Sequence, residues 1–131
     1  MVTDKLQRGQ WIKHNTMEYE ATTKYVRVST RKVRLVADSV RKLTPSAAIA
    51  VLSKMTKSAS VPLSKTIASA LANAKQKGAV ADGLIFKIIE IMGGPGLKRW
   101  HAVSRGQAHS FKKRMTHIRI VLEDTKHGTK N

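Results

Sequence analysis

A long stretch of the chain carries many positive charges and no negative one. No acidic residue occurs between Glu90 and Glu123, and Trp100 and Phe111 are interleaved with the bases of this stretch. Cations neutralise phosphates and aromatic rings stack on unpaired bases, which is what RNA binding requires. We therefore predict phosphate contact for the stretch, whose basic members are Lys98, Arg99, Arg105, Lys112, Lys113, Arg114 and Arg119, with His101, His109 and His117 beside them.

A second group of basic residues surrounds a predicted turn from a strand into a helix. Ser29 is the predicted N-cap, and the first turn of the helix would add oriented N–H groups and partial positive charge. We predict phosphate contact here as well. The alternative for both groups is an ordinary solvated basic face, and Trp100 could pack on the opposite arm of a hairpin instead of on a base. The second group consists of Arg27, Arg31, Lys32, Arg34, Arg41 and Lys42.

The sequence shows neither a catalytic motif nor a metal-binding motif with the required spacing. The pattern Ser-x-x-Lys begins at Ser29, Ser39 and Ser110, but the motifs that accompany it in enzymes are missing. The glycine-rich segment 93–98 lacks the spacing of a phosphate-cradling loop. The three histidines of the basic stretch are eight residues apart, or about 26 Å along a strand, which is too far for one metal ion. We predict no enzyme, no cofactor and no metal site.

The amino-acid composition predicts a protein with a packed apolar core and a basic surface. The chain has 131 residues, 25 Lys and Arg against 8 Asp and Glu, a formal net charge of +17, and 41% hydrophobic residues. Nucleic acid is therefore the leading partner class, and an anionic membrane surface is the second. Cysteine is absent, which excludes a disulfide scaffold. We find no bilayer-spanning apolar run and no export signal, so we expect a cytoplasmic protein, with an organelle as the alternative.

Three helices are predicted by apolar residues at helical spacing. The first spans about 30–42. The second begins at Thr44 and Pro45, since a capping residue followed by proline is a strong start signal, and it runs to about residue 55. The third begins at residues 60–62 and ends at Lys77, with Gly78 as its stop.

Strands are predicted at 24–28, 84–91 and 116–122, where β-branched and aromatic residues are dense or alternate with polar ones. We expect Ile67 of the third helix to be buried against a sheet that contains Phe86, Ile88 and Ile120. The predicted fold class is α+β, with three helices on a small antiparallel sheet. Residues 1–20 show no clear periodicity and are predicted to be an N-terminal extension.

A projecting β-hairpin over about 93–114 follows if the last two strands pair antiparallel. Leu84 would then lie opposite the neighbourhood of Leu122, with the fold-back near Val103 and Ser104. Each arm beyond the core would have about eleven residues and reach roughly 35 Å at ~3.3 Å per residue. Because a lone two-stranded ribbon is marginal in water, it would need a surrounding partner.

Five blocks of the sequence resemble, in order and spacing, the bacterial-type ribosomal protein family called L-twenty-two. They are KYVRVSTRKVRLVAD at 24–38, SALANA at 69–74, GPGLKR at 94–99, RGQA at 105–108 and KRMTHI at 113–118. The resemblance covers about residues 21–124, which it marks as one domain, and it leaves 125–131 as a C-terminal tail. The family's usual hairpin tip is more basic than the segment 101–104 of this chain.

The resemblance implies a structural constituent of the large ribosomal subunit that binds its rRNA, assists its assembly and lines the nascent-peptide exit tunnel with its hairpin. The implied partners are large-subunit rRNA, neighbouring ribosomal proteins and the nascent peptide, with no homo-oligomer and no membrane. The implied rRNA-binding residues are Arg27, Arg31, Lys32, Arg34, Asn73, Lys98, Arg99, Arg105, Lys112, Lys113, Arg114 and His117. The implied tunnel-facing tip consists of Trp100, His101, Ala102, Val103, Ser104 and Arg105.

Two other functions are open to a chain of this charge. One is a DNA-binding or nucleoid protein whose basic ribbon enters a groove. Nothing in the sequence marks the dimer interface such a protein would use, and the charge covers both body and ribbon. The other is an anion-dependent enzyme, which the missing catalytic residues disfavour.

Overall fold

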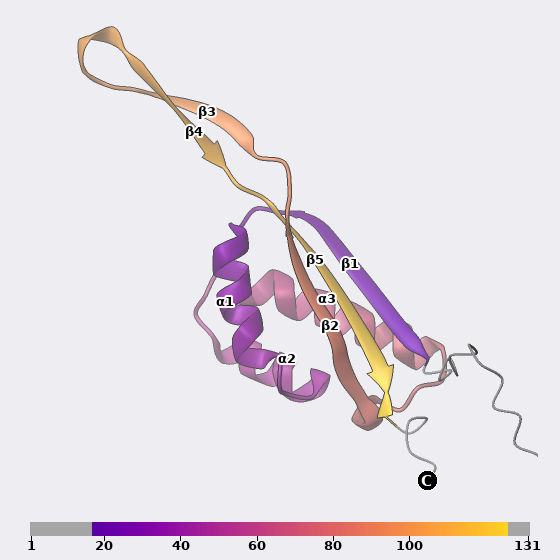
Figure 1. The fold of residues 1–131 in the computed structure, drawn as a ribbon. Coiled ribbons are helices and arrows are strands. Elements are labelled where there is room, and N and C mark those ends of the chain that lie inside the picture. The colour runs from indigo at the N-terminus through magenta and orange to yellow at the C-terminus, as the bar shows by residue number, and fades with distance from the viewer. Residues whose placement is uncertain (1–16, 126–131) are drawn as a thin grey trace, which may run out of the picture.

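Residues 17–125 are described by the computed structural model, in which a body of helices and strands carries one long projecting hairpin (Figure 1). The predictions made for residues 1–16 and 126–131 fall outside the described part of the chain. The elements are β1 (Glu18–Val26), α1 (Thr30–Val40), α2 (Pro45–Lys54), α3 (Ser60–Gln76), η1 (Ala81–Gly83), β2 (Leu84–Gly93), β3 (Leu97–Ala102), η2 (Ser104–Gly106), β4 (Ala108–Lys113) and β5 (Thr116–Asp124).

The sheet of the body has three antiparallel strands in the order β1-β5-β2. The central strand, β5, buries Ile118, Ile120 and Leu122 on the side that faces the helices. In Figure 1, α3 lies behind β1 and β5, and α1 and α2 lie beside β2. The predicted α+β class, with three helices on a small antiparallel sheet and a projecting hairpin, is confirmed.

The first and third helices follow their predicted apolar stripes, whereas in α2 Ala48 and Leu52 are buried but Val51, which we placed in the stripe, is 38% exposed. The buried residues of α1 are Val33, Val36, Ala37 and Val40, which recur at helical spacing. The side chain of Thr44 caps α2 by accepting a hydrogen bond from the N–H of Ala47 (3.4 Å), with Pro45 in the first turn. Ser29 occupies the N-cap position of α1, but its side chain makes no cap hydrogen bond. Gly78 follows α3 with a φ of 83°, a left-handed conformation that ends a helix.

The first strand begins earlier than its sequence pattern predicted. We expected a short strand over 24–28, whereas β1 spans Glu18–Val26 and buries Tyr19 and Ala21. Residues 18–20 of the predicted N-terminal extension therefore lie in the sheet. The alternation was hard to read because only Tyr19 among these first residues is large and apolar, so β1 is fixed by its pairing with β5.

A β-bulge in β2 corrects the predicted core. The pairing with β5 shifts between Phe86 and Ile88, so Lys87 is an extra residue and the inward-facing positions change from even to odd numbers. Ile89 is therefore buried, whereas Ile88, which we placed in the core, is 41% exposed. Ile67 is fully buried, as predicted.

The hairpin consists of β3 and β4, which form a separate two-stranded sheet that projects from the body (Figure 1). Between the body and β3, the three residues 94–96 lie opposite only two, 114 and 115, so the same arm again carries one extra residue. These two shifts displace the predicted pairing. Leu84 lies opposite Asp124, two residues beyond Leu122 and within the predicted neighbourhood, and the fold-back is the turn 104–106, which begins at the predicted Ser104.

Candidate nucleic-acid interface

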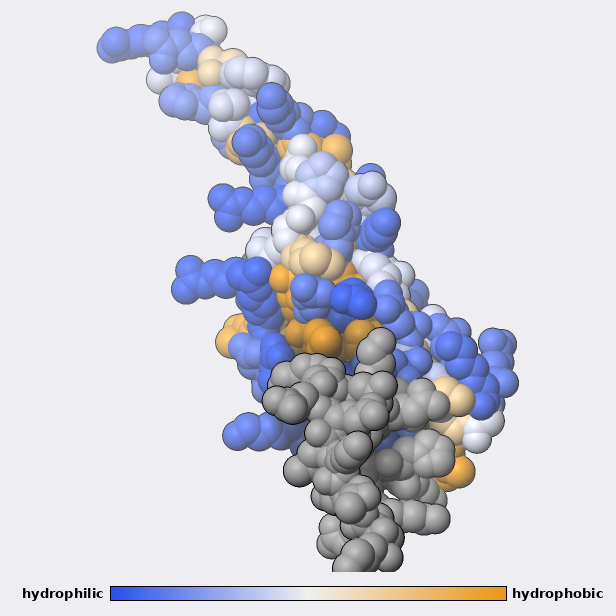
Figure 2. Space-filling model, turned by 45° about the vertical axis from the view of Figure 1, so that its right-hand side comes forward, coloured by the Kyte–Doolittle hydropathy of each residue, from blue (hydrophilic) through white to orange (hydrophobic). Residues whose placement is uncertain are grey.

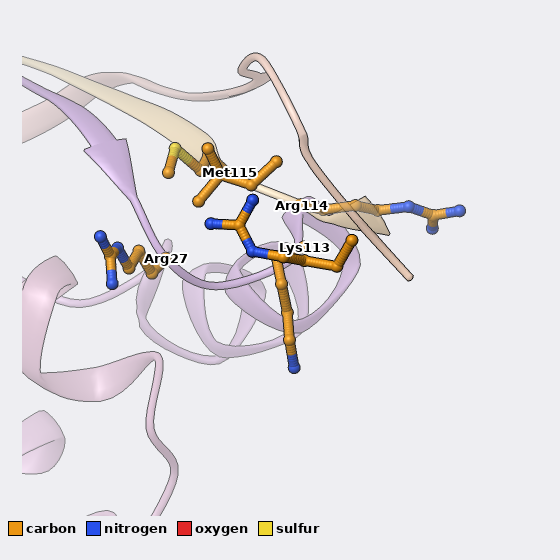
Figure 3. Close-up of a pocket in the computed structure, with 6 residues that line it drawn as sticks. Arg27, Lys113, Arg114 and Met115 are labelled. Atoms are coloured by element: carbon orange, nitrogen blue, oxygen red, sulfur yellow. The ribbon is translucent and has the colours of Figure 1, made fainter. Parts of the chain in front are cut away.

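Two basic hollows lie where the hairpin leaves the body. The first has a volume of about 410 Å³ and is bounded by the end of β1 and the base of the hairpin. In Figure 3, Arg27, Lys113 and Arg114 point their charged ends in different directions, and Met115 lies between their segments. Among residues 17–125, no carboxylate lines this hollow, so the cations repel each other. Its lining residues are Arg27, Leu97, Arg99, Lys113, Arg114 and Met115.

The second hollow adds the beginning of α1 to the same cations. Its volume is about 430 Å³, and it shares Arg27, Lys113 and Arg114 with the first. Ser29, at the N-cap of α1, and Ser58 contribute hydroxyl groups. Helix N-termini, hydroxyl groups and cations are common ligands of phosphate. We call the basic residues that line the two hollows the junction surface: Arg27, Lys32, Arg99, Lys112, Lys113 and Arg114.

Hydrogen bonds at the start of β5 hold the junction surface together. The buried Thr116 hydroxyl donates to the Val28 carbonyl (2.6 Å), which fixes the turn between β1 and α1. The Tyr25 N–H donates to Nδ1 of His117 (3.0 Å), and the two rings meet edge to face. A Cβ on Gly94 would lie 3.1 Å from the His117 ring and 3.3 Å from the Met115 carbonyl oxygen, so a larger residue there would require the ring or the backbone to shift by a few tenths of an ångström. His117 was predicted to bind rRNA, and here it joins β5 to β1.

Along the hairpin, like charges face each other across the two strands. Lys98 lies directly opposite Lys112. Opposed like charges destabilise a strand pair unless an anion lies between them. The ion pairs that join described residues use the cations Arg41, Lys87 and Arg119, all in the body. Figure 2 shows hydrophilic side chains projecting along the hairpin.

The six residues predicted to form the tip are exposed. Trp100 is 69% exposed and lies opposite Ser110, so it does not pack on the other arm. His101 does pack there, with its ring stacked on Phe111 at 4.6 Å between centroids. The turn closes through the Val103 N–H, which donates to the Gln107 carbonyl, with Arg105 in a left-handed conformation (φ 61°). Ala102 and Ser104 complete the tip.

Other predicted binding residues lie away from the hollows or are engaged within the protein. Arg34 donates to the Ile91 carbonyl (3.1 Å) and so joins α1 to β2. Asn73 donates to the Glu20 carbonyl (2.9 Å), near the end of β1 remote from the hairpin. Arg31 is exposed on α1 and lines neither hollow.

Several lining residues were missed because no local signal marks them. Leu97 and Met115 are apolar residues in a basic stretch, and Ser58 precedes α3 without a motif. Pairing of the strands, rather than sequence spacing, brings Arg27 next to Lys113. Members of both basic groups of the sequence therefore meet in one surface, which could be inferred only after β1 had been placed beside β5.

Residues 17–125 hold neither a metal cluster nor a membrane-spanning helix. No group of three or more potential metal ligands occurs among them. Likewise, none of the helices in this part of the chain is long and apolar enough to cross a membrane.

The comparisons with known proteins all point to the same protein family. Residues 21–123 match the family described as Ribosomal protein L22p/L17e. The Large ribosomal subunit protein uL22 of Desulfotalea psychrophila is 47% identical over 109 residues, which are 82% of this chain and 99% of that protein. The Large ribosomal subunit protein uL22 of Mycoplasma capricolum is 41% identical over 111 residues, which are 84% of this chain and 100% of that protein.

Proposed function

The chain belongs to the ribosomal protein L22p/L17e family of the large ribosomal subunit, and from this premise we propose that its junction surface and hairpin bind large-subunit rRNA. The junction surface holds phosphates beside the body, and the hairpin extends between rRNA segments. Binding in this way assists assembly of the subunit. The role is structural rather than catalytic, and its place is the ribosome of the cytoplasm.

The observation that carries the proposal is that cations from distant parts of the chain converge on two hollows that no carboxylate of residues 17–125 lines. Arg27 comes from the end of β1, Lys32 from α1, and Lys113 with Arg114 from the base of the hairpin. Cations that line one hollow without a carboxylate repel each other, and a phosphate bound in the hollow would reduce that repulsion. The opposed Lys98 and Lys112 call for an anion for the same reason.

For the tip, we propose that it lines the nascent-peptide exit tunnel. The support is the family membership together with the position of the tip at the far end of a ribbon held by its base (Figure 1). The tip of this chain carries one arginine, Arg105, and presents an exposed indole at Trp100. Such a tip offers the nascent peptide an aromatic and weakly charged wall.

Binding by the junction surface is tested with Arg27→Gln, Lys113→Gln and Arg114→Gln combined in one variant. Affinity for large-subunit rRNA should fall. For every phosphate that is no longer neutralised, the slope of log affinity against log salt should decrease by roughly 0.7 for single strands and about 0.9 for duplex. The matched control replaces Lys54, Lys65 and Lys75, which lie outside both hollows and outside both predicted basic groups, and so removes the same net charge. An equal decrease in the two variants would refute a localised site.

The tunnel role is tested separately with His101→Ala, Val103→Ala and Arg105→Ala. These residues lie beyond the base of the hairpin, so incorporation into subunits should stay close to that of the parent. Arrest by a stalling peptide should change, because the tip would contact the peptide. Loss of incorporation as complete as in the junction variant would contradict the separation between a binding base and a tunnel-facing tip.

A further inference from the structure

One face of the body sheet is left uncovered by the helices. The register places Glu18, Glu123 and Ile85 in one row across the three strands, and Glu20, Val121 and Ile88 in the next. In Figure 1 this face is turned toward the viewer and α3 lies behind it. We call it the outer sheet face, and it consists of Glu18, Glu20, Ile85, Lys87, Ile88, Glu90, Arg119, Val121 and Glu123.

The outer sheet face is negative in a strongly positive protein. Its four glutamates against Lys87 and Arg119 leave a net charge of −2, whereas the whole chain carries +17. Arg119 lies between Glu20 (3.0 Å) and Glu90 (3.4 Å). Lys87, the bulged residue of β2, reaches Glu18 (2.5 Å) and Glu123 (3.4 Å).

These ion pairs leave negative charge unbalanced. Each cation serves two carboxylates, and Glu18 stands directly opposite Glu123, an arrangement that is unfavourable for like charges. The hydrogen bond and the charge of Arg119 hold the pKa of the Glu20 carboxyl below its ordinary value, so that group stays ionised near neutral pH. A further cation placed over the face would therefore be attracted.

Apolar surface lies among these charges. Ile88 is 41% exposed and Ile85 is 38% exposed, both on β2, the edge strand of the sheet. Val121, between them and β1, is only 2% exposed. An apolar patch with a charged rim is the usual composition of a protein–protein interface.

We propose that the outer sheet face binds a basic segment of a neighbouring large-subunit protein, with apolar side chains of the segment on Ile85 and Ile88. Charge complementarity selects this occupant. The phosphates of rRNA would be repelled by four glutamates. A second copy of the chain would bring the same negative face against this one.

This inference rests on membership of the large subunit and not on the rRNA contacts proposed above. It is tested in assembled subunits that contain the full-length chain with Ile88→p-benzoylphenylalanine, a photo-crosslinker. We expect crosslinks to a segment of another large-subunit protein that carries net positive charge. Crosslinks to rRNA, to residues 1–16 of the same chain, or to nothing above background would each overturn the proposal.

Two controls separate this result from general proximity. The crosslinker in place of Val61, which is 57% exposed on α3, should not capture the same segment. Combining Glu20→Gln with Glu90→Gln should lower the crosslink yield at Ile88 several-fold, whereas Asp38→Asn on α1 removes a carboxylate elsewhere and should not. Unchanged yield in the double variant would refute the electrostatic part of the proposal. Crosslinks from the hairpin to rRNA report on the rRNA proposal independently.

Discussion

The body and the hairpin are built from the same antiparallel pairing, yet only one of them has a core. In the body, β5 lies between two strands and beneath α3, so Ile118, Ile120 and Leu122 are fully buried. In the hairpin, β3 pairs with β4 alone, and every residue over 98–110 is exposed. Strand pairing supplies hydrogen bonds in both regions, but burial of apolar surface requires a further layer. The contrast shows that the hairpin lacks a layer, which the proposed rRNA would supply.

Charge divides the molecule in the same way. The hairpin and its base carry cations and no carboxylate, whereas four glutamates of the sheet lie on the outer face of the body. These glutamates pair with Lys87 and Arg119 of the same sheet. No carboxylate occurs on β3 or β4, and in the proposed function rRNA phosphates neutralise their cations. The apolar core therefore belongs to the body alone, whereas the junction surface draws its cations from both regions.

The largest effect expected from this contrast is in amide hydrogen exchange of the free protein. Amides of α3 and β5 should be protected to the level of global unfolding, which is about 5 kcal/mol or more for a domain. Amides of β3 and β4 should exchange close to the rate of an open chain, because no third layer holds the ribbon. Exchange monitored by NMR checks this, and protection of β4 equal to that of β5 would remove the distinction between the two regions.

Core burial in the body is tested next with Ile67→Ala. Ile67 is fully buried on α3, and its truncation should lower the free energy of unfolding by roughly 2–5 kcal/mol. Val61→Ala on the same helix is the matched control, since Val61 is 57% exposed and the change should cost less than about 0.5 kcal/mol. Urea titration measures both. A difference below about 0.5 kcal/mol between the two variants would show that the apolar stripe of α3 was placed on the wrong side.

The smallest effect concerns the exposed ion pairs on the sheet. Arg119 lowers the pKa of the Glu20 carboxyl in the folded protein, so the pair stabilises the fold above the ordinary glutamate value of 4.5. This contribution is lost as the pH falls below 4.5 through the lowered, folded-state pKa. Between neutral pH and pH about 3, the parent should therefore lose more stability than Glu20→Gln. Parallel curves of unfolding free energy against pH for the two proteins would show that the pair contributes nothing.

The helices and the hairpin were predictable because their signals are local. Thr44 and Pro45 mark a helix start, and the absence of acidic residues between Glu90 and Glu123 marks a surface that would not pack on itself. The sheet faces were less predictable. Residues 84–91 are apolar on both sides of the strand, so nothing in the sequence shows that Lys87 is bulged and that Ile88 turns outward.

The sequence predicted the cations of the candidate site but not how they are arranged in space. Every cation of the junction surface was named from charge alone. That Arg27 and Lys113 line the same hollow depends on the pairing of β1 with β5, a contact between residues almost ninety positions apart. The side chains of Asn73 and His117 also bind groups of the same protein, which a sequence motif does not reveal, and their predicted contacts with rRNA stay predictions.

The two extra residues, one at Lys87 and one within 94–96, both lie on the same arm. The arm from Leu84 to Ala102 is therefore two residues longer than the stretch from Ala108 to Asp124 with which it pairs. A ribbon with unequal edges curves toward its shorter edge, and each bulge adds twist. The path of the hairpin is thus set by chain length, independently of side-chain chemistry. Deleting one residue within 94–96 would re-aim the tip without removing a single charge and without changing which side chains of β2 face inward.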